Sequence, residues 1–154
     1  MNARLILAAF ALALAGCKGE SAVEAPAVHA ESGLSVVPLA VTSQGKVHRF
    51  RVELAQTAEQ QAKGLMFRTK LGPDEGMIFP MNPPRPASFW MRNTVIPLDL
   101  LFVAPDGTVL NIAASAKPYD ETQLTSAGPV KAVLELPGGR AAELGIAAGD
   151  RVQW

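Results

Sequence analysis

Cysteine is almost missing from this chain, whose 154 residues include only one, Cys17. A single thiol excludes an internal disulfide, and it cannot supply the several thiolates of a structural metal site. His48 is the only imidazole in the predicted folded part. A zinc site or a Ser–His catalytic pair would therefore have a poor set of partners. We predict that the chain has no cofactor and that packing alone stabilises its fold.

An excess of charge of either sign is also missing, because fourteen basic residues balance fourteen acidic ones. No basic run stands out, and such runs are what attract proteins to nucleic acids. We therefore predict no nucleic-acid partner. The glycines at Gly138-Gly139 and Gly145 match no phosphate-cradling loop, and no nucleophile elbow is present. A binding module explains the sequence more readily than an enzyme does.

Long hydrophobic runs are limited to residues 5–14, a stretch too short for a permanent membrane span. Arg4 precedes this run, and Ala15-Gly16-Cys17 follows it. The arrangement resembles a bacterial lipoprotein signal, so residues 1–16 are predicted to be a signal peptide that is removed. Cys17 would then carry lipid on its thiol and on its amino group. The alternative is an ordinary secretory signal cleaved after Ala15 or Gly16.

Residues 17–33 are predicted to be the lipidated cysteine and a flexible tether, since Ala, Glu, Ser and Pro dominate without an apolar period. Several acyl chains on one residue anchor a protein stably, so a membrane is the first predicted partner. The predicted location is that of an exported lipoprotein facing the periplasm. Lys18 favours the outer membrane, because enterobacterial lipoproteins retained in the inner membrane carry Asp at this place.

Residues 34–154 are predicted to form one domain made mainly of short strands. A helix is expected over residues 58–63, because Thr57 and Gln60 form a capping box and Gly64 follows the last turn. A second helical turn is expected over 140–144. Strands are expected over 36–41, 48–54, 77–79, 88–92, 98–103, 108–113, 132–136 and 150–153. Short strands separated by Gly and Pro indicate a mainly β, compact single domain, sandwich-like or barrel-like, with one or two short helices.

Two further expectations concern which side chains face water. The strand over 48–54 alternates between apolar and polar residues, so Arg49, Arg51 and Glu53 are expected on its polar face. Glu135 alternates with Leu134 and Leu136, and it is expected to face water as well. Residues 117–129 hold two prolines and no period, so they are expected to form a long loop.

Six motifs follow one another between Gly64 and Asp150, and together they resemble one family. They are Gly64-Leu65-Met66-Phe67-Arg68, Gly76-Met77-Ile78-Phe79, Phe89-Trp90-Met91-Arg92-Asn93-Thr94, Ile96-Pro97-Leu98-Asp99, Val133-Leu134-Glu135-Leu136-Pro137-Gly138-Gly139 and Leu144-Gly145-Ile146 with Gly149-Asp150. The chain is identified by them as a member of the DUF192 (UPF0127) family of bacterial and archaeal proteins. Arg92 stands where the family often has Lys, which keeps the charge. The resemblance implies a mainly β domain, frequently exported or membrane-attached, and it implies no activity.

Asp99 is the most suggestive polar residue, because it stands in an apolar run and is expected to be partly buried. A buried carboxylate needs a cation or several N–H donors. Arg92 and Arg68 are the nearest candidates, since a guanidinium offers paired donors. Two interpretations remain open. Asp99 is either a structural ion pair or turn anchor, or it belongs to a polar cluster that orients a ligand at the mouth of an apolar pocket.

Trp90 is the second candidate. On a strand, Phe89 and Met91 would face one side, whereas Trp90 and Arg92 would face the other. Trp90 is then either buried in a sandwich or a stacking platform for a sugar ring or another flat ligand. The candidate ligand-binding residues are Arg68, Trp90, Arg92, Asn93 and Asp99. A small polar molecule, an envelope glycan or a partner protein is the expected ligand.

Two less favoured chemistries are also possible. Thioethers bind Cu(I), and the candidate ligands are Met66, Met77, Met81 and Met91, although methionine is also a common filler of irregular cores. A hydrolase acting on envelope sugars would need two carboxylates, for which Asp99 and Glu135 are the possible pair. We expect neither a metal site nor catalysis, and keep the hydrolase as the alternative function.

Overall fold

The computed structural model of this protein describes residues 27–154. The predicted signal peptide, Cys17 and residues 18–26 of the predicted tether lie outside the described residues. Strands make up 48% of the structure, and two short helices accompany them in a single compact domain. The mainly β fold class is therefore confirmed. Within residues 27–154, neither helix has the length and hydropathy of a membrane-crossing segment.

Ten strands and two helices follow one another along the described chain. In order they are β1 (Ala27–Val28), β2 (Ser35–Ser43), β3 (Lys46–Leu54), α1 (Ala58–Lys63), β4 (Glu75–Arg85), β5 (Ser88–Phe89), β6 (Leu98–Val103), β7 (Val109–Ala116), β8 (Leu124–Thr125), β9 (Val130–Pro137), α2 (Arg140–Leu144) and β10 (Arg151–Gln153).

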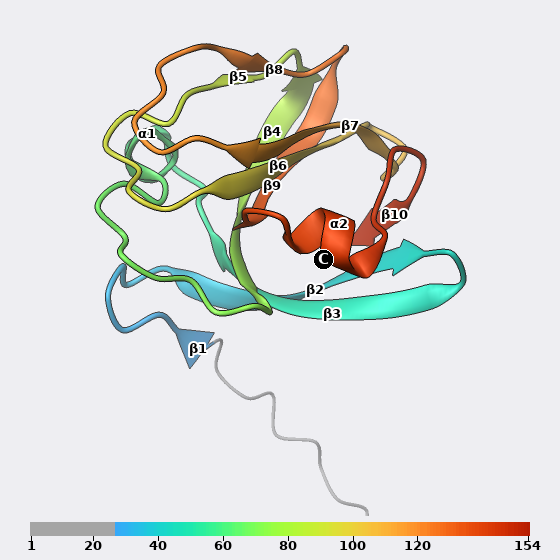
Figure 1. The fold of residues 1–154 in the computed structure, drawn as a ribbon, viewed down its shortest axis with the longest axis horizontal. Coiled ribbons are helices and arrows are strands. Elements are labelled where there is room, and N and C mark those ends of the chain that lie inside the picture. Colours follow the sequence, from blue (N-terminus) through green and yellow to red (C-terminus); the bar gives the residue numbers. More distant parts are fainter. Residues whose placement is uncertain (1–26) are drawn as a thin grey trace, which may run out of the picture.

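One large mixed sheet organises the fold. Its strands run in the order β1-β2-β3-β4-β9-β6-β7, β10 pairs with β2, and β5 and β8 form a separate small sheet. The β3–β4 pair is parallel, whereas the other pairs are antiparallel. The sheet curls so that β2 and β3 face β6, β7 and β9, with α2 between these layers (Figure 1). A single bridge joins Thr108 to Arg151, and the sheet does not close into a barrel.

The central strands β4, β9 and β6 are covered on both faces, and this produces two cores. The α2-side core lies inside the curl and includes Val52, Leu101 and Leu134. The α1-side core lies on the opposite face and includes Phe79, Leu100 and Val133. Successive residues of a strand point to opposite faces, so each central strand contributes to both cores. Strands in such a position need apolar side chains on both faces.

Both helices begin and end where the sequence predicts. The Thr57 hydroxyl accepts a hydrogen bond from the Gln60 backbone N–H at 3.2 Å, and the Gln60 side chain accepts one from the Thr57 N–H at 3.0 Å. These two bonds form the predicted capping box of α1, and Gly64 ends the helix with a positive φ of 47°. The local signals at this helix are therefore sufficient to define it.

Most strand boundaries differ from the expected ones, and β4 is much longer than the strand expected over 77–79. The strand expected over 88–92 ends at Phe89, because the chain turns there to reach β6. The loop expected over 117–129 contains β8, which pairs with β5. The predicted tether is shorter than expected, since residues 27–28 pair with β2 and His29 contacts Arg68. We call residues 27–33 the N-terminal strap.

Candidate functional site

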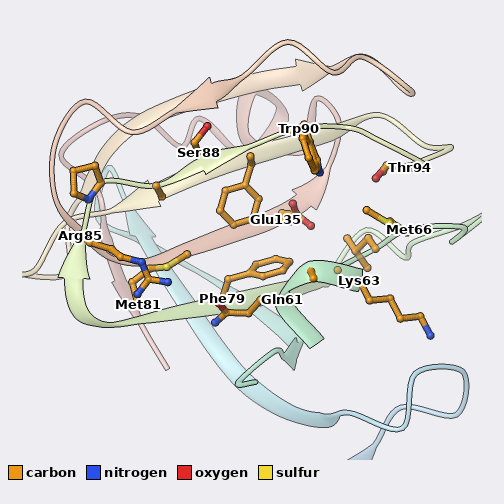
Figure 2. A pocket seen from close by; sticks show the side chains of 16 residues that line it. Gln61, Lys63, Met66, Phe79, Met81, Arg85, Ser88, Trp90, Thr94 and Glu135 are labelled. Atoms are coloured by element: carbon orange, nitrogen blue, oxygen red, sulfur yellow. The ribbon is translucent and has the colours of Figure 1, made fainter. Parts of the chain in front are cut away.

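A pocket of about 340 Å³ opens over the α1-side core. Residues from α1 and the turn after it form one wall, and the segment between β4 and Trp90 forms the opposite wall (Figure 2). β4 and β9 contribute the floor. The pocket is lined by Gln61, Ala62, Lys63, Gly64, Leu65, Met66, Phe79, Met81, Arg85, Pro86, Ala87, Ser88, Phe89, Trp90, Thr94 and Glu135.

Aromatic rings and thioethers provide most of the apolar lining. Phe79 of β4 and Phe89 of β5 meet edge to face, with ring centroids 5.1 Å apart. Trp90 follows directly and remains 45% exposed at the pocket's rim. Met66 and Met81 lie toward opposite ends of the pocket (Figure 2). Such a lining suits a ligand with a flat or apolar body.

Glu135 is the one acidic residue among these lining residues, and it lies in the floor of the pocket. In register it is flanked by Met77 of β4 and Leu100 of β6, so it occupies an apolar row of the α1-side core. The residue is only 5% exposed. Its side chain lies between Trp90 and Phe79 in the close view (Figure 2). Glu135 thus places a carboxyl at a position where the paired neighbours on both adjacent strands are apolar.

Burial changes the acidity of this carboxyl. Loss of hydration raises the pKa of Glu135 to about 8, and among residues 27–154 no cation or hydrogen-bond donor counteracts the shift. The group is therefore mainly neutral at pH 7. In that state it can donate one hydrogen bond into the pocket as well as accept others. Strongly shifted acids in a cleft are characteristic of functional sites.

The expectation that Glu135 faces water is wrong. Its neighbours Leu134 and Leu136 do lie in the α2-side core, but the opposite face of β9 is covered as well. Sequence alternation distinguishes two faces but does not show that both are buried. The available signal was the apolar character of the flanking residues, with Val133 and Leu134 before Glu135 and Leu136 after it.

Asp99 lies on the other face of the sheet and is fully buried. Its carboxylate accepts backbone hydrogen bonds from Ser115 at 2.7 Å, Gly139 at 2.9 Å and Ala141 at 2.8 Å. Gly139 is the N-cap of α2 and has no side chain to cap it, so Asp99 performs this role from β6. These three bonds fit the interpretation of Asp99 as a turn anchor, which is one of the two interpretations that the sequence left open.

The expected arginine partners of Asp99 are wrong. Within residues 27–154, Arg68 and Arg92 pair with other acids. Asp99 aligns with Leu136 on β9, whereas Glu135 aligns with Leu100. Directly opposed residues share a face, so Asp99 and Glu135 point to opposite sides of the sheet. The two carboxyls therefore cannot act on one bond as the acid and base of a hydrolase.

Arg68 belongs to a buried ion pair. One of its terminal nitrogens, Nη2, lies 2.8 Å and 2.9 Å from the two carboxylate oxygens of Glu53. Both residues are buried, so the expectation that Glu53 sits on a solvent-facing side is wrong. The N-terminal strap covers the pair, with the His29 ring 3.4 Å from Arg68 and the Glu31 carboxylate 3.3 Å from it. Burial of both charges is tolerated because each neutralises the other.

Trp90 and Arg92 stay together at the surface. The Arg92 guanidinium lies 3.9 Å from the centroid of the Trp90 ring, a cation–π contact. Arg92 also donates two hydrogen bonds to Glu121, at 2.6 Å and 3.1 Å, and this contact holds the pKa of Glu121 below its usual range. Asn93 is exposed nearby and donates to the Met66 sulfur at 3.9 Å. The structure therefore brings Trp90, Arg92 and Asn93 close to the pocket and leaves Asp99 away from it.

The four methionines do not form a common ligand set. Met77 and Met91 are buried in the α1-side core, and Met66 and Met81 lie toward opposite ends of the pocket (Figure 2). Residues 27–154 contain no group of three or more His, Cys, Asp or Glu side chains arranged for a metal ion. In this structure the methionines are packing and lining residues, as is common for this side chain.

The fold and the pocket define a mainly β domain with one aromatic pocket over a buried acid. The model of the DUF192 family, described as "Uncharacterized ACR", matches residues 39–154, and the chain belongs to this family.

Two solved structures are similar to the chain. A protein of unknown function from Novosphingobium aromaticivorans DSM 12444 shares 61% sequence identity with a TM-score of 0.83, covering 90% of this chain and 99% of that one. A proposed transcription regulator from Sinorhizobium meliloti 1021 shares 40% identity with a TM-score of 0.76, covering 78% of this chain and 94% of that one. No curated protein matches.

Proposed function

We propose that this protein is a binding module whose pocket holds a small organic molecule. The ligand would have an apolar or aromatic body and one neutral group that accepts a hydrogen bond. The observation that carries the proposal is the Glu135 carboxyl, which is 5% exposed in the pocket floor and has no hydrogen-bond partner among the described residues 27–154. Burying such a group costs free energy unless something bonds to it. A ligand carbonyl or hydroxyl would provide that bond.

The charge of the ligand follows from the pKa of Glu135. Below pH 8 the carboxyl is neutral and donates, so a neutral acceptor binds well. Above pH 8 it becomes a carboxylate, which repels an acceptor and attracts a cation. The cations on the lining, Lys63 and Arg85, oppose a cationic ligand. Lys63 points its amine away from the pocket (Figure 2).

A matched series of three probes tests this assignment by ligand-observed NMR. Acetophenone has an aromatic body and a neutral acceptor, ethylbenzene has the body alone, and protonated 1-phenylethylamine has a cation. We expect acetophenone to bind more tightly than ethylbenzene at pH 6 and to lose this advantage at pH 9.5. A preference for the amine at pH 6, or equal binding of all three probes at both pH values, would contradict the proposal.

Two variants place the effect on one side chain. Glu135→Gln keeps an N–H donor but cannot ionise, so its preference for acetophenone should be the same at pH 6 and pH 9.5. Glu135→Leu removes the donor, so acetophenone and ethylbenzene should bind equally. A pH dependence that survives in Glu135→Gln would assign the effect to another group.

The cellular location is part of the same proposal. The sequence around Cys17 supports an exported lipoprotein whose domain faces the periplasm, with Lys18 favouring the outer membrane. The membrane is then a partner through the N-terminal lipid. Mass spectrometry of the mature protein tests this, because lipidation adds acyl mass to an N-terminal Cys17. Recovery of an unmodified Cys17 in mature protein would remove the membrane anchor and leave the pocket proposal standing.

A hydrolase acting on envelope sugars receives less support. Such enzymes use two carboxyls about 5–10 Å apart across a cleft. Glu135 is the only acid among the residues that line the pocket, and Asp99 lies on the opposite face of the sheet. A sugar remains a possible ligand class for the aromatic rim, where binding would require no second acid.

A further inference from the structure

Three loops meet beside one end of the pocket, two of which contribute the lining residues Met66, Trp90 and Thr94, while the third carries Tyr119. The backbone N–H of Phe67 donates to the Asn93 carbonyl at 2.8 Å, and that of Tyr119 donates to the Thr94 carbonyl at 3.2 Å. The loops that carry Phe67 and Tyr119 are thus bonded to adjacent carbonyls of the loop that follows Trp90. We call Phe67, Trp90 and Tyr119 the aromatic rim.

The aromatic rim is unusually exposed. Phe67 is 65% exposed, Tyr119 is 63% exposed and Trp90 is 45% exposed. These three residues include the only tyrosine of the chain and one of its two tryptophans. Tyr and Trp combine an apolar ring with a polar atom, and both are enriched where a membrane meets water.

The backbone at the rim is held in a conformation that disfavours these residues. Phe67 has a φ of 63° and Tyr119 a φ of 62°, in the left-handed region that bulky side chains rarely adopt. Neither side chain is buried in return, so packing in the domain does not explain the conformation. The backbone hydrogen bonds to Asn93 and Thr94 hold both residues in this conformation, which leaves both rings exposed beside the pocket.

The described chain begins beside the same rim. The N-terminal strap contacts Arg68, the residue next to Phe67, through His29 and Glu31. Residues 18–26 separate the strap from Cys17, and a segment of this length spans at most about 35 Å. A lipid on Cys17 would therefore keep Ala27, the first residue of the strap, within this distance of the bilayer surface, and the strap's His29 and Glu31 contact the residue next to Phe67. Exposed lysines at positions 63, 70 and 117 and exposed acids at positions 31, 120 and 121 lie around the rim, so its surroundings carry charges of both signs.

We propose that the aromatic rim rests on the surface of the membrane to which the N-terminal lipid attaches the protein, at the boundary between headgroups and acyl chains. This inference rests on the lipid anchor of the proposed function. It also refines that function, because Trp90 and Met66 line the pocket next to the rim. The mouth of the pocket would face the bilayer, and its ligand would be a lipid-soluble molecule that enters from the membrane.

The two tryptophans allow a direct test. Trp90 lies at the rim. Trp154 contacts Lys131, and the next residue, Ala132, pairs with Val103. Val103 is at the end of β6 opposite to the one that follows the rim loop, so the two tryptophans lie in different parts of the domain. Trp154→Phe leaves Trp90 as the only tryptophan, and Trp90→Phe leaves Trp154. The mature full-length protein would be reconstituted into vesicles of phosphatidylcholine and phosphatidylglycerol that contain a phosphatidylcholine brominated on its acyl chains, which quenches tryptophan on contact.

We expect strong quenching of Trp90 and little quenching of Trp154. The double variant Phe67→Gly with Tyr119→Gly, in the Trp154→Phe background, should reduce the quenching of Trp90 several-fold. Glycine adopts a positive φ without strain, so this variant should fold at least as well as its parent. A loss of quenching in a well-folded variant would therefore reflect the two rings and not damage to the fold.

The possible failures can be distinguished. Flotation in a density gradient first shows whether the protein is attached to the vesicles. If the protein does not float with them, the proposed lipid anchor is wrong, and this inference is wrong with it. If it floats but Trp90 and Trp154 are quenched equally, or the glycine variant is quenched like its parent, the rim does not touch the membrane. The anchor and the pocket then stand, and a rim that contacts a partner protein would give this second result.

Discussion

Asp99 and Glu135 are two buried carboxyls on neighbouring strands, and their surroundings differ completely. Asp99 is fully buried and accepts three backbone hydrogen bonds that hold α2 and the end of β7. Glu135 is almost as buried, but its pKa is determined by lost hydration alone. Asp99 faces the α2-side core, and Glu135 faces the pocket in the α1-side core.

The difference separates a structural carboxylate from a candidate ligand group. The hydrogen bonds of Asp99 are satisfied within the chain, so its charge stabilises the fold and leaves no capacity for a ligand. Glu135 decreases stability in its ionised form, and no group in the described part of the chain compensates. A group that the fold does not use is a better candidate for binding than one that the fold requires.

The largest expected effect comes from removing Asp99. Asp99→Ala would leave three backbone N–H groups without their acceptor, two of them around the start of α2. Each unsatisfied buried donor costs about 1–3 kcal/mol, so we expect a loss of about 4 kcal/mol in the free energy of unfolding. Urea denaturation measures it. A loss below 1 kcal/mol, or a variant that folds normally but loses probe binding, would reverse the roles of the two carboxyls.

A smaller loss is expected from the third buried acid. Glu53→Gln would remove the buried counter-charge of the Arg68 guanidinium and leave only the exposed Glu31 beside it, at a cost of about 3 kcal/mol. The double variant Glu53→Leu with Arg68→Met removes both charges, and its stability should return close to that of the parent protein. Urea denaturation of the parent protein, the single variant and the double variant gives the three free energies of unfolding that are compared. If the double variant were as unstable as the single one, packing and not charge would explain the loss.

Glu135 should show the opposite behaviour, with stability that depends on pH. Its folded pKa of about 8 lies above the unfolded value of 4.5, so the folded state binds the extra proton. The contribution of Glu135 to the free energy of unfolding is therefore fully present below pH 4.5. It decreases as the pH rises to about 8 and stays low above that value. Glu135→Leu should be more stable than the parent protein at pH 9, by a few kcal/mol at most, and the difference should shrink toward pH 4.

Denaturation curves of both proteins between pH 4 and pH 9 provide this measurement. Glu135→Gln serves as the control for the loss of titration without a change in size. A difference between the parent protein and Glu135→Gln that does not change with pH would show that folding does not shift the pKa of Glu135.

The smallest effect is expected at the surface. Arg92 pairs with Glu121 and stacks on Trp90, but both ends of the ion pair are about half exposed. Exposed ion pairs contribute about 0–1 kcal/mol, so Arg92→Ala should change the free energy of unfolding by less than about 1 kcal/mol. The same variant uncovers one face of Trp90 and should shift its fluorescence. A large loss of stability would show that this corner of the pocket is part of the structural core.

Local features of the fold could be predicted from the sequence, and long-range ones could not. The capping box of α1 and the full extent of β6 follow from residues adjacent in the chain. The position of β9 between β4 and β6 does not, because it brings together strands far apart in the sequence. That position buries Glu135, which the sequence presents only as a water-facing residue and as one acid of a hydrolase pair. Trp90, Arg92 and Asn93 were recognised from their composition, and Asp99 was recognised as buried but assigned the wrong partners.

Titration of the Glu135 carboxyl is the most direct test of the account. Carbon-13 NMR of protein labelled at the glutamate side-chain carboxyls would follow every glutamate between pH 3 and pH 10, and Glu135→Gln would assign the signal. The account predicts one resonance with a midpoint near 8 that is absent from the variant, and acetophenone should move this midpoint upward. If Glu135 instead titrates with the exposed glutamates, below about pH 5, the pocket does not hold a neutral acid and the proposed binding chemistry is wrong.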